Sequence, residues 1–237
     1  MARRAFNLLV ASDGSTSARA AVASVARFPW PRHSRARGVV AGETLPVAEW
    51  PPSVWVALQR SLQQTAHATR RMLRRRWPDA DVAIINRPPV EAILGEARRR
   101  SATVIVVGSR GHGALARLVL GSVSLGVARR APCTVLVAKG RRRQVQRFII
   151  ALDGSVNSRR AVEFVAGLTV PEGGAVTLVS VVEPVRPVSA TPLPASVRDT
   201  VNGWVAALAA QQQRAARREF DRATGRLKPA GWTVDTE

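Results

Sequence analysis

The chain repeats one segment of its own sequence at a constant offset of 140 residues. Residues 7–26 read NLLVASDGSTSARAAVASVA, and residues 147–166 read RFIIALDGSVNSRRAVEFVA. An ungapped match of this kind indicates that a structural unit has been duplicated. Each copy has a short apolar run, the tripeptide Asp-Gly-Ser, and then Ala and Val at helical spacing. We therefore expect a strand, a turn and a helix at the start of two related domains.

The first copy continues as an alternation of strands and helices. Short apolar runs predict strands at Asn7–Ala11, Arg37–Gly42, Asp81–Asn86, Thr103–Val107 and Thr134–Ala138. Apolar residues at helical spacing predict helices at Ser15–Arg27, Ser53–Trp77, Pro89–Arg100 and Ser122–Arg130. This alternation predicts an α/β fold, in which an open parallel sheet is covered by helices on both faces.

The second copy starts in the same way but holds fewer elements. We expect strands at Phe148–Leu152, Ala175–Val182 and Trp232–Val234, and helices at Ser158–Leu168 and Ser196–Lys228. Adding 140 to the glycine-rich stretch at 108–124 gives 248–264, beyond residue 237. We therefore expect domains at 1–140 and 147–237, the second an incomplete repeat. Its first strand would be a bare edge, covered by the N-terminal half, by another chain, or by the missing part of a longer tandem protein.

The stretch VVGSRGHGALARLVLGSVS contains Gly108, Gly111, Gly121 and Ser122 in the spacing G-x2-G-x9-G-S. It follows a strand, and parallel sheets bind ligands at the carboxyl ends of strands. Glycine there permits a positive φ and a close approach of the backbone to a ligand. We expect Ser122 to cap a helix whose first amides hold a phosphate. The stretch lacks the Lys of a P-loop, and the first strand is not followed by G-x-G-x-x-G.

The net charge of +20 comes almost entirely from Arg, since Lys139 and Lys228 are the two Lys residues. The Arg residues form short scattered clusters without interleaved aromatic residues, unlike a nucleic-acid stacking platform. We interpret them as a compositional bias that permits non-specific binding to polyanions. A nucleic-acid-associated protein is one alternative.

Other function classes find little support in the residues. Three His and one Cys offer no catalytic triad and no metal-ligand spacing. Cys133 is expected to pack in the core. The chain has no run of about 18 apolar residues, as a membrane helix requires, and its first apolar run reads as a strand. We therefore expect a cytoplasmic protein with no catalytic residues.

Four segments together resemble the universal stress protein family. They are the G-x2-G-x9-G-S spacing, ASDGSTS after the first strand, PPVEAILGEA before the fourth and APCTVLV at the fifth. The resemblance covers residues 5–138 and, more weakly, 147–237. It implies a five-stranded sheet in the order 3-2-1-4-5, of the adenine nucleotide alpha-hydrolase-like class. It also implies ATP binding in members with this spacing, and a homodimer through the edge strand Thr134–Ala138.

The resemblance also implies a set of nucleotide-binding residues. Ala11 and Asp13 would face the adenosine, Val40 would pack against adenine, and Mg²⁺ would be held by phosphate oxygens and water. The base and ribose would further be lined by Val107 and Gly108, and the phosphates held by Gly111, Gly121, Ser122, Val123 and Ser124. Asp13 and Asp153 could instead be turn residues. We prefer the turn for Asp153 and the ligand role for Asp13.

The resemblance thus implies an ATP-binding regulatory or sensor module of the stress response, in which ATP hydrolysis, if any, is slow. Three alternatives stay open at this point. The chain could be a family member that binds no nucleotide and acts through protein contacts, or a polyanion-binding basic protein. It could also be a hydrolase of the related superfamily, although the S-G-G-x-D-S sequence usual there is missing.

Overall fold

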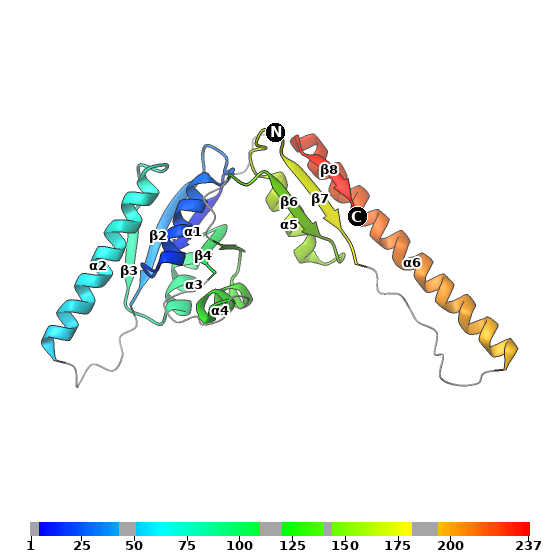
Figure 1. Ribbon diagram of the computed structural model, residues 1–237, viewed down its shortest axis with the longest axis horizontal. Helices are drawn as coiled ribbons and strands as arrows, with labels where there is room; N and C mark the ends of the chain where they lie inside the picture. The colour runs from blue at the N-terminus through cyan, green and yellow to red at the C-terminus, as the bar shows by residue number, and fades with distance from the viewer. Residues whose placement is uncertain (1–4, 43–50, 110–119, 140–143, 182–193) are drawn as a thin grey trace. The chain divides into compact units, whose positions relative to one another are not determined.

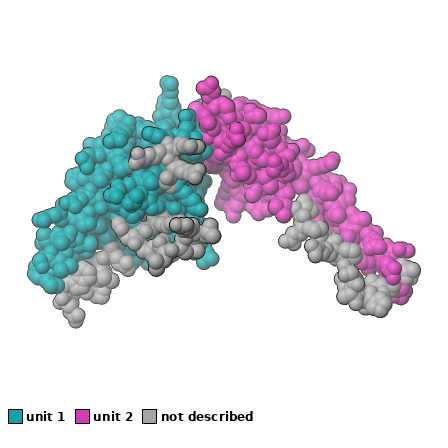
Figure 2. Space-filling view, viewed as in Figure 1, with its two compact units in different colours: residues 1–145 teal, residues 146–237 magenta. Residues whose placement is uncertain are grey.

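The structure is a computed structural model of the 237-residue chain, and it describes residues 5–42, 51–109, 120–139, 144–181 and 194–237. The chain forms two compact units, Met1–Val145 and Gln146–Glu237, which Figure 2 colours separately. Among the described helices, none combines the length and the apolar character that crossing a bilayer requires.

The first unit is built on a five-stranded parallel sheet (Figure 1). Its strands are β1 (Asn7–Ala11), β2 (Arg35–Ala41), β3 (Val82–Ile85), β4 (Val104–Gly108) and β5 (Thr134–Ala138). Its helices are α1 (Thr16–Arg27), α2 (Pro52–Arg74), α3 (Pro89–Arg99) and α4 (Ser122–Arg130). The strand order is β3-β2-β1-β4-β5, which confirms the expected 3-2-1-4-5. The strand β2 begins two residues earlier than predicted, because the exposed Arg35 and Arg37 alternate with buried residues.

Both faces of the sheet are buried at its central strands. Successive residues of a strand point to opposite faces, so Leu8 and Val10 lie on one side of β1 and Leu9 on the other. All three are less than 4% exposed. Leu9 belongs to a core cluster with Leu94 of α3 and Val127 of α4. The helices pack in pairs, α1 beside α2 and α3 beside α4, which matches the predicted helix layers.

Helix α3 carries a buried carboxylate, Glu96, whose side chain is 3% exposed. It accepts hydrogen bonds from Nη2 of Arg99 at 2.6 Å and from Nε of Arg100 at 3.1 Å. Burial alone would raise the pKa of Glu96. The hydrogen bonds and charges of the two guanidinium groups outweigh burial, so the pKa lies below its ordinary value.

We expect Glu96→Gln to lower the free energy of unfolding at pH 7 by about 1 kcal/mol, a small figure because Arg99 is exposed and Arg100 is half-buried. A carboxyl whose pKa is lower in the folded protein stabilises the fold above its unfolded pKa, and that stabilisation is lost as the pH falls through the folded value. The variant should therefore lose less stability than the wild type between pH 7 and pH 3. Urea unfolding at both pH values measures this difference. Parallel losses in the two proteins would contradict the assignment.

The second unit has a three-stranded parallel sheet in the order β6-β7-β8. Its elements are β6 (Arg147–Ala151), α5 (Val156–Ala166), β7 (Ala175–Val179), α6 (Ala195–Leu227), a 3-10 turn η2 (Lys228–Ala230) and β8 (Thr233–Thr236). Helices α5 and α6 bury Val162, Ala223 and Leu227. As expected, β6 is an edge strand, and no strand of the described residues pairs with its outer side.

Candidate functional site

The first feature of the candidate site is the turn that follows β1. Oδ1 of Asp13 accepts a hydrogen bond from the Ser15 N–H at 2.9 Å, and Oγ of Ser15 accepts one from the Ala18 N–H at 3.1 Å. These bonds close the turn and cap α1. Gly14 adopts a φ of +78° between them. The motif Asp-Gly-Ser therefore supplies a turn residue, a left-handed residue and a helix cap.

The same turn follows β6 in the second unit. Oδ1 of Asp153 accepts from the Ser155 N–H at 2.9 Å, and Oγ of Ser155 accepts from the Ser158 N–H at 3.1 Å. Hydrogen bonds from the side chain and backbone of Ser155 lower the pKa of Asp153 to about 2. Both aspartates thus have the turn role, which the sequence analysis preferred for Asp153 and kept as the alternative for Asp13.

The second feature is the junction between β4 and α4. The Gly121 N–H donates to the Ser109 carbonyl at 3.0 Å, and the Ser124 hydroxyl donates to the Gly108 carbonyl at 2.6 Å. The Ser109 N–H donates to the Ala138 carbonyl of the neighbouring strand β5 at 3.1 Å. These bonds hold the start of α4 against the carboxyl end of β4.

The expectation that Ser122 caps α4 is wrong, and the positive φ that glycine permits at position 108 is not used. The residue that caps α4 is Gly121, in an extended conformation, and Ser122 is the first helical residue with an exposed side chain. A positive φ is found at Gly14 and not at Gly108, which is the last residue of a regular strand. The cap differs because the Gly121 carbonyl already accepts the first intrahelical bond, from the Leu125 N–H at 2.9 Å.

The first turn of α4 is a favourable place for an anion. The first amides of a helix have no acceptor within the helix, and the dipole places a partial positive charge there. In α4 these are the amides of Ser122, Val123 and Ser124, and no acidic residue lies in the turn. The two serine hydroxyls differ in their surroundings. The Ser124 hydroxyl, in a residue that is 4% exposed, donates to strand β4, whereas the Ser122 side chain faces solvent.

The structure brings most of the predicted site residues to one edge of the sheet. The register pairs Val10 with Val106, so Ala11, the last residue of β1, and Asp13, two residues beyond it, lie beside the end of β4. At this edge lie Ala11, Asp13, Gly108, Gly121, Ser122, Val123 and Ser124. Val40 and Val107 are 1% and 3% exposed, so their side chains are enclosed in the core. Gly111 lies outside the described residues, as do Arg110, His112 and Arg117.

Sequence reasoning missed two serines that position this edge, Ser12 and Ser109. Both are buried, and each directly follows a strand. The Ser12 N–H donates to the Val39 carbonyl at 3.0 Å, and the Ser109 carbonyl accepts from Gly121. A small polar residue immediately after an apolar strand was the signal that could have identified them.

The described residues contain no group of three or more His, Cys, Asp or Glu side chains that could hold a metal ion. Cys133 packs against the core cluster of the first unit, as predicted, and burial raises the pKa of its thiol. It is therefore a poor nucleophile.

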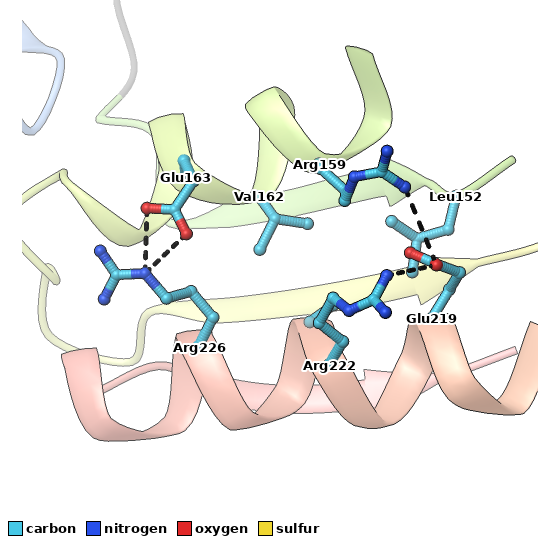
Figure 3. Close-up of a pocket in the computed structure, with 8 residues that line it drawn as sticks. Leu152, Arg159, Val162, Glu163, Glu219, Arg222 and Arg226 are labelled. Carbon is cyan, nitrogen blue, oxygen red and sulfur yellow. Dashed lines mark hydrogen bonds and ion pairs between the residues drawn. The ribbon is translucent and has the colours of Figure 1, made fainter. Parts of the chain in front are cut away.

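A cavity of about 240 Å³ lies between α5 and α6 of the second unit (Figure 3). Its floor is apolar, and its rim carries ion pairs. Nε of Arg226 donates to both carboxylate oxygens of Glu163 at 2.7 and 2.9 Å, and Arg222 lies 2.6 Å from Glu219. Each carboxylate already has a guanidinium partner. Arg222 and Glu219 both belong to α6, whereas the ion pair of Glu163 with Arg226 and the 3.9 Å pair of Arg159 with Glu219 join α5 to α6. We therefore interpret the rim as ion pairs that link the two helices, and not as a ligand site.

The chain is similar to known proteins of one family. The model of the universal stress protein family matches residues 6–139. The "Universal stress protein in QAH/OAS sulfhydrylase 3'region" of Thermus aquaticus is 37% identical over 134 residues, which are 56% of this chain and 97% of that protein.

Two solved structures extend the comparison. A universal stress protein from Archaeoglobus fulgidus aligns with 98% of this chain and 77% of its own, at 16% identity and a TM-score of 0.63. At that identity it shows that the fold is shared. A universal stress protein crystallised in complex with cAMP is 25% identical and aligns with 58% of this chain and 100% of its own, with a TM-score of 0.40.

Proposed function

From the premise that the chain belongs to the universal stress protein family, we propose that its first unit is an ATP-binding regulatory or sensor module of the stress response. One observation carries the proposal. The two hydrogen bonds from Gly121 and Ser124 hold the free amides of α4 at the carboxyl edge of the sheet. Ligands of open parallel sheets bind at that edge, and a helix N-terminus suits phosphate.

The proposed ligand matches the chemistry of this edge. The amides of Ser122, Val123 and Ser124 would donate to phosphate oxygens, together with Gly111. The Gly121 N–H already donates to the Ser109 carbonyl, so Gly121 would hold the phosphates by letting its backbone approach them closely. The adenosine would lie beside Ala11, Asp13 and Gly108, and the enclosed Val40 and Val107 would support the wall behind it. Mg²⁺ would be bound by phosphate oxygens and water. We propose that the nucleotide stabilises this edge and that hydrolysis is slow or absent, because fast phosphoryl transfer needs a charge clamp and a positioned water.

The test removes one amide while keeping the helix. Proline is favoured at the first helical position, and Gly121 already has the extended backbone that a following proline requires, with φ −61° and ψ 154°. We expect Ser122→Pro to weaken ATP binding about tenfold or more, since hydrogen bonds to charged groups contribute about 1.5–3 kcal/mol. Ser122→Ala, which removes the hydroxyl alone, should have the smaller effect. Equilibrium dialysis measures both affinities.

Other outcomes distinguish the alternatives. Equal ATP affinity in Ser122→Pro and the wild type would place the ligand elsewhere. A wild-type chain that retains neither ATP, AMP nor cAMP would favour a member that acts through protein contacts. Salt-sensitive retention of any polyanion, without saturation by ATP, would favour the basic-protein alternative.

We propose three further properties at the level of the whole chain. The edge strand β5 would pair with its counterpart in a homodimer, since the sheet order leaves one side of β5 without a neighbour among the described strands. Residues 147–237 would be a second repeat of the first unit's fold, because their Asp-Gly-Ser turn makes the same hydrogen bonds. The protein would act in the cytoplasm.

A further inference from the structure

The sheet of the second unit has one covered face and one open face. On the covered face, Ile150, Val176 and Leu178 are at most 4% exposed. Side chains alternate along a strand, so Ile149 and Ala151 of β6 lie on the opposite face, beside Thr177 and Val179 of β7. We call these four residues the open face. Ile149 is 77% exposed, which is unusual for a large apolar side chain at the middle of a strand.

The first copy of the repeat shows which elements cover the equivalent face of a complete sheet. At the offset of 140 residues, Ile149 corresponds to Leu9 and Val179 to Val39. Leu9 and Val39 are each 1% exposed, in the core cluster with residues of α3 and α4. The equivalent face in the first unit is therefore covered by helices. The open face has the apolar character of a surface that receives a helix.

A helix with an unpartnered apolar stripe is present in the same unit. In the first turns of α6, Val197, Val201, Trp204 and Leu208 follow one another at spacings of four, three and four residues, which places them on one side of the helix. Trp204 is 80% exposed, and Val197 and Leu208 are each 43% exposed. We call these four residues the α6 stripe.

Helix α6 cannot place its stripe on the open face of its own sheet. With 33 residues it is about 50 Å long, whereas the five residues of β7 span only about 17 Å. Its C-terminal half is anchored on the covered face through Ala223 and Leu227, both buried. Figure 1 shows its N-terminal half extending past the strands. A continuous helix anchored on one side of a sheet does not reach the other side, so α6 leaves the open face of its own sheet uncovered.

The charges favour a second copy of this chain. A chain with a net charge of +20 repels its copies wherever Arg residues meet. Residues 200–213 of α6, TVNGWVAALAAQQQ, contain no charged residue. An anionic surface would be recognised through Arg, which this stretch lacks, whereas two copies can meet here without bringing like charges together.

We propose that two copies associate reciprocally, with the α6 stripe of each chain packed on the open face of the other. The contact then occurs twice in the dimer. A stable interface buries roughly 1,600 Å² in total, or about 800 Å² for each contact. A buried Trp side chain supplies about 150–250 Å² of this area, which makes Trp204 the expected anchor.

The test uses Trp204→Arg, Ile149→Arg and an equimolar mixture of the two, measured by sedimentation velocity on the 237-residue chain. Each variant alone has both contacts damaged, and its dimer dissociation constant should rise at least tenfold. In the mixture, the intact α6 stripe of Ile149→Arg can pack on the intact open face of Trp204→Arg. One contact is thereby restored, so association should partly recover. Val156 is an exposed apolar residue of the same unit that belongs to neither the open face nor the α6 stripe. Val156→Arg is therefore the matched control and should associate like the wild type.

Three results would overturn the proposal. The wild type could stay monomeric, as it would if the first unit of the same chain covers the open face. Either variant could associate like the wild type. The mixture could fail to recover, which would indicate that identical surfaces pair with each other. Pairing through β5 would be equal in all samples, because no substitution touches Thr134–Ala138. Unchanged circular dichroism and unchanged ATP binding separate loss of association from misfolding and from the nucleotide proposal.

Discussion

Trp232→Ala is expected to lower the free energy of unfolding of the second unit by about 3–5 kcal/mol, the usual range for a large aromatic residue removed from a core. Trp232 is 3% exposed, and its ring meets that of Phe148 edge to face at 5.2 Å. Its indole N–H donates to the Val165 carbonyl at 3.2 Å. The free energy of unfolding of a unit of this size is small, so this loss should unfold it.

Hydrogen exchange followed by mass spectrometry resolves the two units. Peptides from β6 and β7 should exchange much faster in Trp232→Ala, while peptides from β1 and β4 should stay protected. Trp232→Phe keeps an aromatic ring and removes the N–H. It should therefore lower the free energy of unfolding by less, about 1–3 kcal/mol. Trp30→Ala is the reciprocal control, because the Trp30 N–H donates to the Val25 carbonyl at 3.0 Å, at the position equivalent to Val165. Unchanged exchange in β6 and β7 would contradict the prediction.

Gly14→Ala should destabilise the first unit by about 2–5 kcal/mol, and the repeat provides its control. Gly14 and Gly154 adopt φ values of +78° and +75°, where any L side chain adds roughly 1–2 kcal/mol of strain. A Cβ on Gly14 would also lie 2.7 Å from Oγ1 of Thr65 in α2, whereas a Cβ on Gly154 would have no neighbour within 4 Å. Overpacking of that kind adds about 1–3 kcal/mol.

The difference between the two glycine variants therefore measures the contact with α2. Urea unfolding gives the loss in unfolding free energy for each variant. It is monitored by hydrogen exchange in β1 for Gly14→Ala and in β6 for Gly154→Ala. The double variant Gly14→Ala with Thr65→Ala should recover part of the stability, because the crowded hydroxyl is removed. Equal losses at the two glycines, or no recovery in the double variant, would show that backbone strain alone explains the effect.

Much of the fold could be predicted from local sequence. Apolar runs and helical spacing identified each described strand and helix, with ends that differ from the structure by a few residues. The short run of β8 was predicted at Trp232–Val234 and is found at Thr233–Thr236. Periodicity identifies these elements because the spacing of apolar residues in a strand or a helix is visible within a few residues of sequence. The carboxyl edge was predictable for the same reason, since glycine and serine directly follow the strands there.

The details of the site depended on residues far apart in the chain. The sequence could not show that the Ser124 hydroxyl donates to Gly108, 16 residues earlier, or that Gly121 and not Ser122 caps α4. It predicted Val40 against adenine and Val107 beside the base and ribose, but it could not show that both side chains are enclosed in the core. Hydrogen-bond partners and burial are set when elements pack, and identical motifs can then have different surroundings, as Gly14 and Gly154 do.

By itself, the sequence determined the alternation of elements, the duplicated strand–turn–helix and the family, because each is recorded in neighbouring residues. Only the tertiary structure decided which surfaces are covered. Leu9 and Ile149 occupy the same place in the repeat, yet one is 1% and the other 77% exposed. Burial depends on whether a helix lies against the strand, and that is a property of the packed unit rather than of the strand's own residues.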